Sequence, residues 1–213
     1  MEPRSIDTAA RYAALAAAGE LSDSDAEELL GVIQNSPDAR LRRSALGAVA
    51  RAGGANDARA AWQAGVRDAD PAVRRHAATL APLALRAELD ETNDAQQLVR
   101  TLDDDDALVA ESAAWALGEI PWASTASVAG ALARTAGAHP DPLVREAAVA
   151  ALGAIGDPVG LPAILRACTD RPQVRRRAVL ALAQYDGPEV EAALQRALTD
   201  SDWQTRQAAE DLL

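Results

Sequence analysis

The chain has 213 residues and a net charge of −11, from 32 acidic residues against 21 basic ones, all of them arginine. This acidic balance argues against a general binder of nucleic acids or anionic membranes, because attraction to phosphate requires a net positive face. Alanine makes up roughly a quarter of the residues, phenylalanine is absent and β-branched residues are few, so the composition predicts an all-α protein.

The first apolar segment predicts a helix over about residues 6–19. Glu2, Asp7 and Arg11 interrupt this region, which therefore lacks the pattern of a signal peptide. No uninterrupted apolar stretch in the sequence approaches the roughly 18 residues of a membrane span. The single cysteine, Cys168, excludes a disulfide framework. We therefore expect a cytoplasmic protein without a membrane segment.

After this helix, one pattern recurs in six copies at intervals of 30 to 36 residues. The clearest copy, DPLVREAAVAALGAIG, begins at Asp141 and predicts a helix from its apolar spacing. Asp lies three residues before the apolar anchor in five of the copies, and Pro71 and Pro142 follow it, as is typical of a helix start. The anchors of the six copies are Leu41, Val73, Val109, Val144, Val174 and Thr205.

A shorter amphipathic segment precedes each capped helix, at about 23–34, 56–67, 93–102, 124–137, 159–169 and 188–198. The repeated unit is therefore helix, turn, capped helix. Such a pair is too thin to bury its own apolar face, so neighbouring units must stack. We predict one domain over 1–213, with a capping helix at 1–20 and repeats at about 21–54, 55–90, 91–122, 123–156, 157–186 and 187–213.

The Asp-x-x-Val-Arg core and the following Ala-Ala-x-Ala-Leu-Gly, best seen at Asp141–Gly153, resemble the HEAT repeat in its short, phycobilisome-lyase-type form. The resemblance covers nearly the whole chain and implies a right-handed α-solenoid of about six repeats. Three residues depart from the pattern: Ala110 stands where Arg is expected, Arg171 where Asp is expected and Thr205 where Val is expected.

In HEAT-repeat proteins the Asp and Arg of the motif commonly form a ladder between neighbouring repeats, and the resemblance implies the same role here. Opposite charges that recur at every interface of a stack agree with a structural role, whereas catalysis would need one special site. The expected ladder residues are Asp38, Arg42, Asp70, Arg74, Asp141, Arg145, Arg175, Asp202 and Arg206.

Function is then expected where the copies differ. The resemblance places the capped helices on the concave side, with positions two and six after each anchor pointing into the groove. A tryptophan among charged groups is typical of a protein-binding hot spot, but the sequence leaves open whether Trp115 packs into the seam between helices instead. The expected partner-binding residues are Arg43, Arg75, Glu111, Trp115, Trp122, Glu146, Arg176 and Leu180.

Other chemistry-bearing residues do not suggest a site. The four carboxylates of Asp103–Asp106 fit a solvated loop better than a calcium site, which needs spaced ligands. His76 and His139 lie two repeats apart without metal-ligand spacing, and Trp62 and Trp203 are expected to pack. No P-loop, dinucleotide fingerprint or nucleophile elbow is present in the sequence. We expect no catalytic residue, metal or cofactor.

These patterns favour a non-enzymatic adaptor that binds a protein or peptide. The alternatives are a HEAT-like DNA glycosylase, a chromophore-lyase-type enzyme, or a building block of a larger assembly or an engineered repeat protein. A glycosylase needs a basic groove, which the net charge and the pair Glu111 and Glu146 oppose. No lyase signature is found, and the unequal intervals favour a natural chain.

Overall fold

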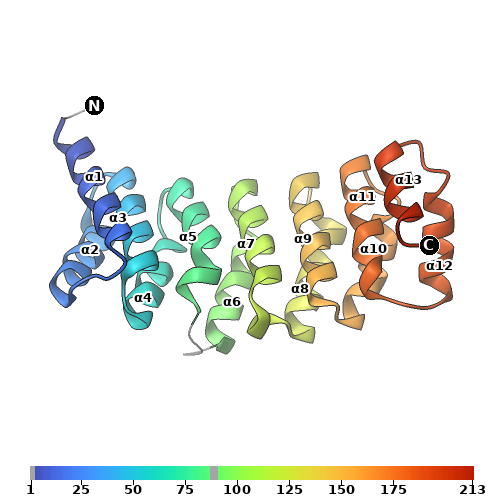
Figure 1. The fold of residues 1–213 in the computed structure, drawn as a ribbon, viewed down its shortest axis with the longest axis horizontal. Coiled ribbons are helices and arrows are strands. Elements are labelled where there is room, and N and C mark those ends of the chain that lie inside the picture. The colour runs from blue at the N-terminus through green and yellow to red at the C-terminus, as the bar shows by residue number, and fades with distance from the viewer. Residues whose placement is uncertain (1–2, 87–90) are drawn as a thin grey trace. The chain divides into compact units, whose positions relative to one another are not determined.

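The computed structural model describes residues 3–86 and 91–213, and within these residues the chain forms helices and no strand (Figure 1). The predicted all-α fold is therefore confirmed. The chain divides into two compact units, Met1–Asp90 and Glu91–Leu213, called here unit 1 and unit 2. The division coincides with the expected boundary between the second and third repeats. A single domain over 1–213 stays a prediction.

Helices alternate along both units as the repeat pattern predicts, with shifts of a few residues at the helix ends, where limits vary most. Unit 1 contains α1 (Pro3–Ala18), the pair α2 (Asp23–Asn35) and α3 (Ala39–Ala52), and the pair α4 (Ala55–Gly65) and α5 (Pro71–Ala84). Unit 2 contains the pairs α6 (Glu91–Thr101) and α7 (Ala107–Glu119), α8 (Ala126–Ala138) and α9 (Pro142–Ile155), α10 (Leu161–Ala167) and α11 (Pro172–Ala181), and α12 (Pro188–Ala197) and α13 (Trp203–Glu210). Three short 3-10 helices of unit 2 are η1 (Pro121–Ala123), η2 (Pro158–Gly160) and η3 (Leu182–Gln184).

The second helix of each pair begins at the residue that the motif predicts. Arg171 gives α11 no side-chain cap, and Pro172 occupies the first turn there. Because the first N–H groups of a helix have no partner within it, each cap fixes where its helix starts. In the other five helices, first-turn N–H groups donate to the side chains of Asp38, Asp70, Asp106, Asp141 and Asp202.

Glycine allows the second helices of unit 2 to pack at very short range. A Cβ atom on Gly118 of α7 would lie 2.9 Å from the Cα of Ala151, and one on Gly153 of α9 would lie 3.0 Å from the Cα of Ala181. Both distances are shorter than carbon–carbon contact, so a larger residue would force the helices apart. The glycine of the motif therefore brings α7, α9 and α11 into direct contact in one layer (Figure 1).

Arginine–aspartate pairs join successive repeats within each unit. In each pair, Nε and Nη2 of an arginine on a second helix donate to the two carboxylate oxygens of an aspartate in the next turn along the stack, over 2.6 to 2.8 Å. The side chains are largely buried, which strengthens the attraction and raises the cost of separating the charges. The pairs are Arg42 with Asp68 in unit 1, and Arg145 with Asp170 and Arg175 with Asp200 in unit 2.

The aspartates of this ladder are not the ones that the sequence predicts. The predicted carboxylates, those of Asp38, Asp70, Asp141 and Asp202, turn toward the first-turn N–H groups of their own helices and cap them. The ladder carboxylates lie just before the motif, and they accept the backbone N–H of a motif residue. Asp68 accepts from Asp70 at 2.8 Å, and Asp200 accepts from Asp202 at 2.8 Å.

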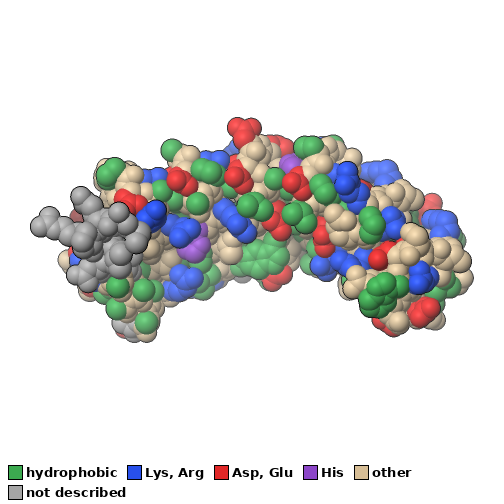
Figure 2. Space-filling view, turned by 90° about the horizontal axis from the view of Figure 1, so that it is seen from above, with side chains coloured by type: hydrophobic (Ala, Val, Ile, Leu, Met, Phe, Trp, Pro, Cys, Tyr) green, Lys and Arg blue, Asp and Glu red, His purple; other side chains and the backbone are tan. Residues whose placement is uncertain are grey.

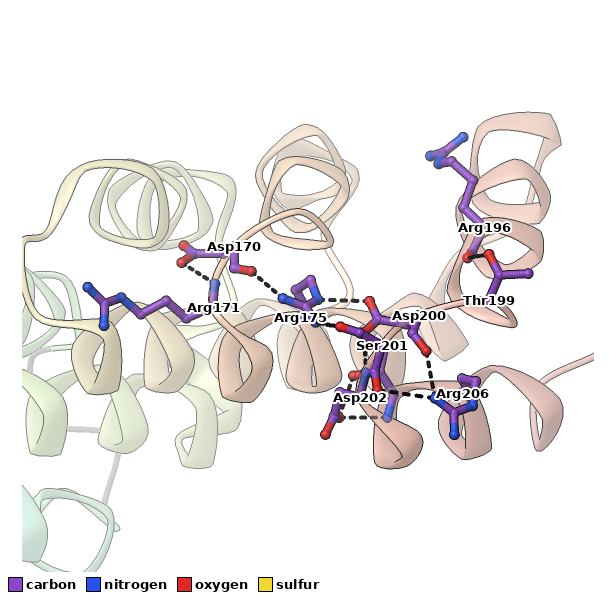
Figure 3. A network of polar contacts seen from close by, with 10 residues as sticks. Asp170, Arg171, Arg175, Arg196, Thr199, Asp200, Ser201, Asp202 and Arg206 are labelled. Atoms are coloured by element: carbon purple, nitrogen blue, oxygen red, sulfur yellow. Dashed lines mark hydrogen bonds and ion pairs between the residues drawn. The ribbon is translucent and has the colours of Figure 1, made fainter.

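The motif arginines also hold the turn that precedes their own helix. Nη1 of Arg175 donates to the carbonyl oxygen of Asp170 at 2.9 Å, and Nη1 of Arg206 donates to that of Asp200 at 2.7 Å. Arg74 does the same to the carbonyl oxygen of Asp68 at 3.0 Å. Each ladder aspartate is therefore bound at its side chain and at its backbone, which gives a continuous polar chain along the last repeats (Figure 3).

The ladder arginines hold the pKa values of their carboxyl partners below the ordinary range. Hydrogen bonds from Arg145 lower the pKa of Asp170, and those from Arg175 lower the pKa of Asp200. A carboxyl group with a lower pKa in the folded state stabilises the fold above its unfolded pKa of about 3.9. That contribution is lost as the pH falls through the folded pKa.

Replacing a ladder arginine should cost more stability than replacing a surface arginine. Arg145→Ala is expected to lower the free energy of unfolding by about 2–3 kcal/mol, since Asp170 and two turn carbonyls lose their donor. Arg196→Ala, on the exposed side of α12, should cost less than about 1 kcal/mol. Urea unfolding of both variants measures the difference, and equal midpoints would contradict a structural role for the ladder.

Acid should remove the contribution of the Asp170 carboxylate. At neutral pH, Asp170→Asn is expected to be less stable than the native chain by about 1–3 kcal/mol, because charged hydrogen bonds become neutral ones. Below about pH 4 the carboxyl group of the unfolded chain takes up a proton first, and that of the folded chain does so at lower pH, so the difference between the two proteins should shrink as the pH falls. Urea unfolding between pH 7 and pH 2.5 tests this, and a difference that does not change with pH would refute it.

Candidate partner-binding surface

The second helices of unit 2 present one face to the surroundings. α7, α9, α11 and α13 lie side by side in chain order, and the first helices α6, α8, α10 and α12 pack on their other side (Figure 1). We call the exposed and half-exposed residues of these four second helices the second-helix face of unit 2. This face includes Leu108, Glu111, Trp115, Leu143, Glu146, Arg176, Leu180 and Trp203.

Trp115 is the aromatic residue of α7 on this face, and 44% of its surface is exposed. The seam beside it is closed to a large ring, because Gly118 and Ala151 already touch there. The small residues Ala113 and Ala116 on either side of Trp115 are buried instead. The sequence leaves open whether Trp115 packs into the seam between helices or is exposed, and in the structure it is exposed.

Large aliphatic side chains are exposed on the same face as Trp115, on α7 itself, on the neighbouring α9 and on α11 beyond it. Leu180 of α11, which the sequence predicts on this face, is 43% exposed. Leu108 and Leu143, each directly before its anchor valine, are 43% and 47% exposed, although neither is among the predicted binding residues. The signal that could have found them is the position before the anchor, which holds leucine in these two neighbouring copies and in no other.

Trp203 was expected to pack in the core, and this expectation is wrong, because 64% of its surface is exposed. It follows the cap residue Asp202 directly and lies one helical turn before Gln207, which is also exposed. A residue at the first position of a helix is not yet enclosed by the following turns, so periodicity alone does not determine its burial. Hydrophobic side chains thus reach the surface between charged ones (Figure 2).

Charged side chains of the face connect neighbouring helices. The carboxylate of Glu146 on α9 lies 3.7 Å from the guanidinium of Arg177 on α11. Arg176 of α11 donates a hydrogen bond to the side chain of Gln204 on α13. Glu111, one turn before Trp115, is half-buried. The aliphatic and aromatic groups therefore stand among polar groups that are partly held in place.

Comparison with known proteins agrees with this architecture. A sequence model of HEAT repeats matches residues 95–173 and 163–213, more than half of the chain. The chain belongs to the HEAT-repeat family.

Solved structures similar to this HEAT-repeat protein are also repeat proteins. An engineered protein is 21% identical with a TM-score of 0.65, covering 89% of this chain and 95% of its own. A designed armadillo repeat protein is 19% identical with a TM-score of 0.62, over 87% and 97%. The YibA protein of Escherichia coli is 19% identical with a TM-score of 0.66, over 94% and 71%. At these identities the likeness is one of fold. No curated protein matches the sequence.

The remaining predicted binding residues of this HEAT-repeat protein lie elsewhere. Trp122 belongs to η1, beyond the end of α7, and is half-buried. Arg43 of α3 and Arg75 of α5 are exposed, and both belong to unit 1. A groove shared by all eight predicted residues stays a prediction, whereas the second-helix face of unit 2 contains Glu111, Trp115, Glu146, Arg176 and Leu180 of that set.

Reactive and metal-binding groups are not gathered into a site in the described part of the HEAT repeats. No group of three His, Cys, Asp or Glu side chains there could hold a metal ion, and no described helix is long and apolar enough to cross a membrane. Within Asp103–Asp106, Asp104 accepts the N–H of Asp106 at 3.0 Å, and Asp106 caps α7. Burial raises the pKa of the Cys168 thiol to about 11, so it stays protonated at neutral pH.

Fluorescence quenching can test the two tryptophan environments of this HEAT-repeat protein. Trp62 is fully buried in α4 and Trp115 is 44% exposed. Trp115→Phe should therefore remove part of the emission that iodide quenches, whereas Trp62→Phe should remove emission that iodide does not reach. The measurement is a Stern–Volmer titration of each variant against the native chain. Loss of unquenchable emission in Trp115→Phe would contradict the exposed ring.

Proposed function

We propose that the protein is a non-catalytic adaptor that binds a protein or peptide segment through the second-helix face of unit 2. The observation that carries the proposal is the exposure of Trp115 between Leu and Glu side chains on a face formed entirely by packed helices. HEAT and armadillo repeat folds commonly serve as scaffolds for protein interactions, which supports this class of function.

A tryptophan on such a face can supply much of the binding free energy of a complex. Its ring buries a large area with the loss of only two side-chain torsions, and hot spots are enriched in this residue. Leu108 of α7 and Leu143 of the neighbouring α9 can exclude water beside it, as the rim of a hot spot does, and Leu180 of α11 extends the exposed apolar groups along the face. Because the face stands on helices held by the glycine contacts and the ladder, little ordering is needed on binding.

The charges of the face favour a particular kind of partner. Glu111 precedes Trp115 by one turn, and Glu146 occupies the matching position of the next repeat. A partner with an apolar anchor beside Lys or Arg would complement these carboxylates. Arg176 on α11 would meet an acidic group further along the same partner. Such complementarity acts mainly on the rate of association and on specificity.

The test starts with capture of a partner from the organism that encodes the chain, followed by measured affinities. Trp115→Ala combined with Arg176→Glu should abolish binding and leave helicity unchanged. Truncating an aromatic anchor typically costs about 2 kcal/mol or more, which is roughly thirtyfold in Kd. The arginine reversal should slow association and alter its salt dependence. Titration calorimetry measures the affinity and circular dichroism the helicity.

Val159→Ala is the control, since Val159 is 49% exposed but lies in η2, outside the second-helix face. It should leave the affinity within a few tenths of a kcal/mol of the native value. A double variant that retains the partner would show that binding uses another surface. If DNA were the only captured molecule, the adaptor proposal would fall and a glycosylase-like activity would become the next to measure.

A further inference from the structure

Unit 1 contains a small cavity whose wall is unusually rich in positive charge. It lies between α1, α3 and α5 and has a volume of about 190 Å³. Arginine side chains gather around a histidine in this part of the surface, on the left of Figure 2. The residues that line it include Tyr12, Arg43, Ser44, Gly47, Arg51 and His76.

The two arginines of the cavity are not neutralised by the protein. In the described residues, neither Arg43 nor Arg51 forms an ion pair, although Arg42 on the same helix is paired with Asp68. The side chain of Arg51 donates to the carbonyl oxygen of Gly47 at 2.8 Å, which holds the guanidinium at the cavity. Both arginines are exposed to solvent and line the same cavity, so together they offer two unpaired cations to an anion from solution.

The carboxylate of Glu28, which interacts electrostatically with the α1 wall of the cavity, is already hydrogen-bonded within the protein. Glu28 of α2 influences the Tyr12 hydroxyl electrostatically. Both its oxygens, however, accept hydrogen bonds from Arg11, at 2.9 and 3.0 Å. Glu28 therefore does not supply the negative charge that Arg43 and Arg51 lack.

Two further polar groups of the cavity have no partner within the described part of the chain. The hydroxyl of Ser44 makes no hydrogen bond there, whereas the helical Thr79 donates to the carbonyl oxygen of Arg75 at 3.0 Å. The ring of His76 makes none either, and most of it is buried. Burial first, and the charges of Arg51 and Arg43 second, lower the pKa of His76 to about 4, so the neutral ring carries one N–H donor at neutral pH.

Gly47 keeps the floor of the cavity open. A Cβ atom at this position would lie 2.7 Å from Nη1 of Arg51 and 3.1 Å from Nε2 of His76. Both nitrogens therefore face the same bare stretch of α3. Any larger residue at position 47 would displace these groups from their present places.

We propose that this cavity binds a phosphate group, held by Arg43 and Arg51 with Ser44 and His76 as additional donors. Two guanidinium groups match the charge of roughly −1.5 to −2 that a phosphate monoester carries near pH 7. Phosphate presents three or more oxygens in a tetrahedral arrangement, and the cavity offers donors on two helices around it. A carboxylate carries half of that charge and only two oxygens, so it would leave donors unused.

The phosphate group can belong to a free ion or to a phosphorylated side chain of a protein, and the chemistry of recognition is the same. The site lies on α1, α3 and α5, whereas the proposed partner-binding face lies on unit 2. Failure of either proposal therefore leaves the other standing, because the variants and the ligands differ.

The experiment is titration calorimetry of the full chain, in a buffer without phosphate, with inorganic phosphate, acetate and a phosphoserine peptide with its unphosphorylated counterpart. Phosphate should bind and acetate should bind at least tenfold more weakly. Tighter binding of the phosphopeptide than of the ion would identify a phosphorylated protein as the source, and the reverse would identify the free ion. Absence of phosphate binding, or equal binding of acetate, would overturn the proposal.

Variants separate a built site from diffuse attraction. Arg43→Gln should weaken phosphate binding about tenfold or more, since a charged double hydrogen bond is lost. Arg40→Gln on the same helix removes the same charge outside the cavity and is the matched control. Gly47→Ala should also weaken binding while the helix is maintained or strengthened, because alanine favours helices over glycine. Equal loss in the two arginine variants would refute a specific site.

The imidazole signals of the two histidines give a second readout by NMR. Phosphate should shift the ring signals of His76, and those of His139, which belongs to unit 2, should stay in place. Equal shifts of both rings, or a fixed His76 ring at saturating phosphate, would contradict binding in the cavity.

Discussion

Each ladder arginine forms hydrogen bonds both to the turn before its own helix and to a carboxylate of the next repeat, and the stacking of the repeats depends on both sets of bonds. Nη1 of Arg175 binds the turn before its own helix, while Nε and Nη2 bind the carboxylate of Asp200 in the next repeat. The carboxylate in turn accepts the N–H of Asp202, the residue that caps α13. One guanidinium therefore sets the spacing of two turns and the start of the following helix. An exposed ion pair would contribute little, but these side chains are largely buried, so separating them would leave an unpaired charge out of water.

The close helix contacts and the ladder together determine which residues are left for recognition. Gly118 and Gly153 bring neighbouring helices so near that no large side chain fits between them. Leu117 of α7 and Leu152 of α9 are buried in the core, whereas Trp115 lies on the face of α7 away from these contacts and is exposed. Its exposure follows from the packing of the repeats, and it does not require a special local structure. The same constraint makes the face rigid, which is the property that a preorganised binding surface needs.

The sequence predicts the helices well because their signals are local. An Asp cap, a Pro in the first turn and apolar spacing each act within one helix, and they place α9 within the residues that the motif suggests. The ladder partner was missed because Asp170 lies outside the motif, in a turn whose position depends on the neighbouring repeat. Trp203 was misjudged for a related reason, since burial at a helix start depends on what covers it. The ladder partner and the burial of a residue at a helix start thus depend on tertiary contacts between repeats, which apolar periodicity does not predict.

Net charge describes the average of a surface and says little about a single cavity. Charges in water are screened over about 8–10 Å at moderate salt, so acidic residues farther away than this do not cancel the positive charge of Arg43 and Arg51 at the cavity. The acidic balance that opposes long-range attraction to a nucleic acid is therefore compatible with local capture of one phosphate group. Repulsion grows with the charge of the ligand, so the acidic balance opposes a polyanion more strongly than it opposes a single phosphate group. The same chain can thus carry an apolar and acidic face on unit 2 and a basic cavity on unit 1, with different ligands for each.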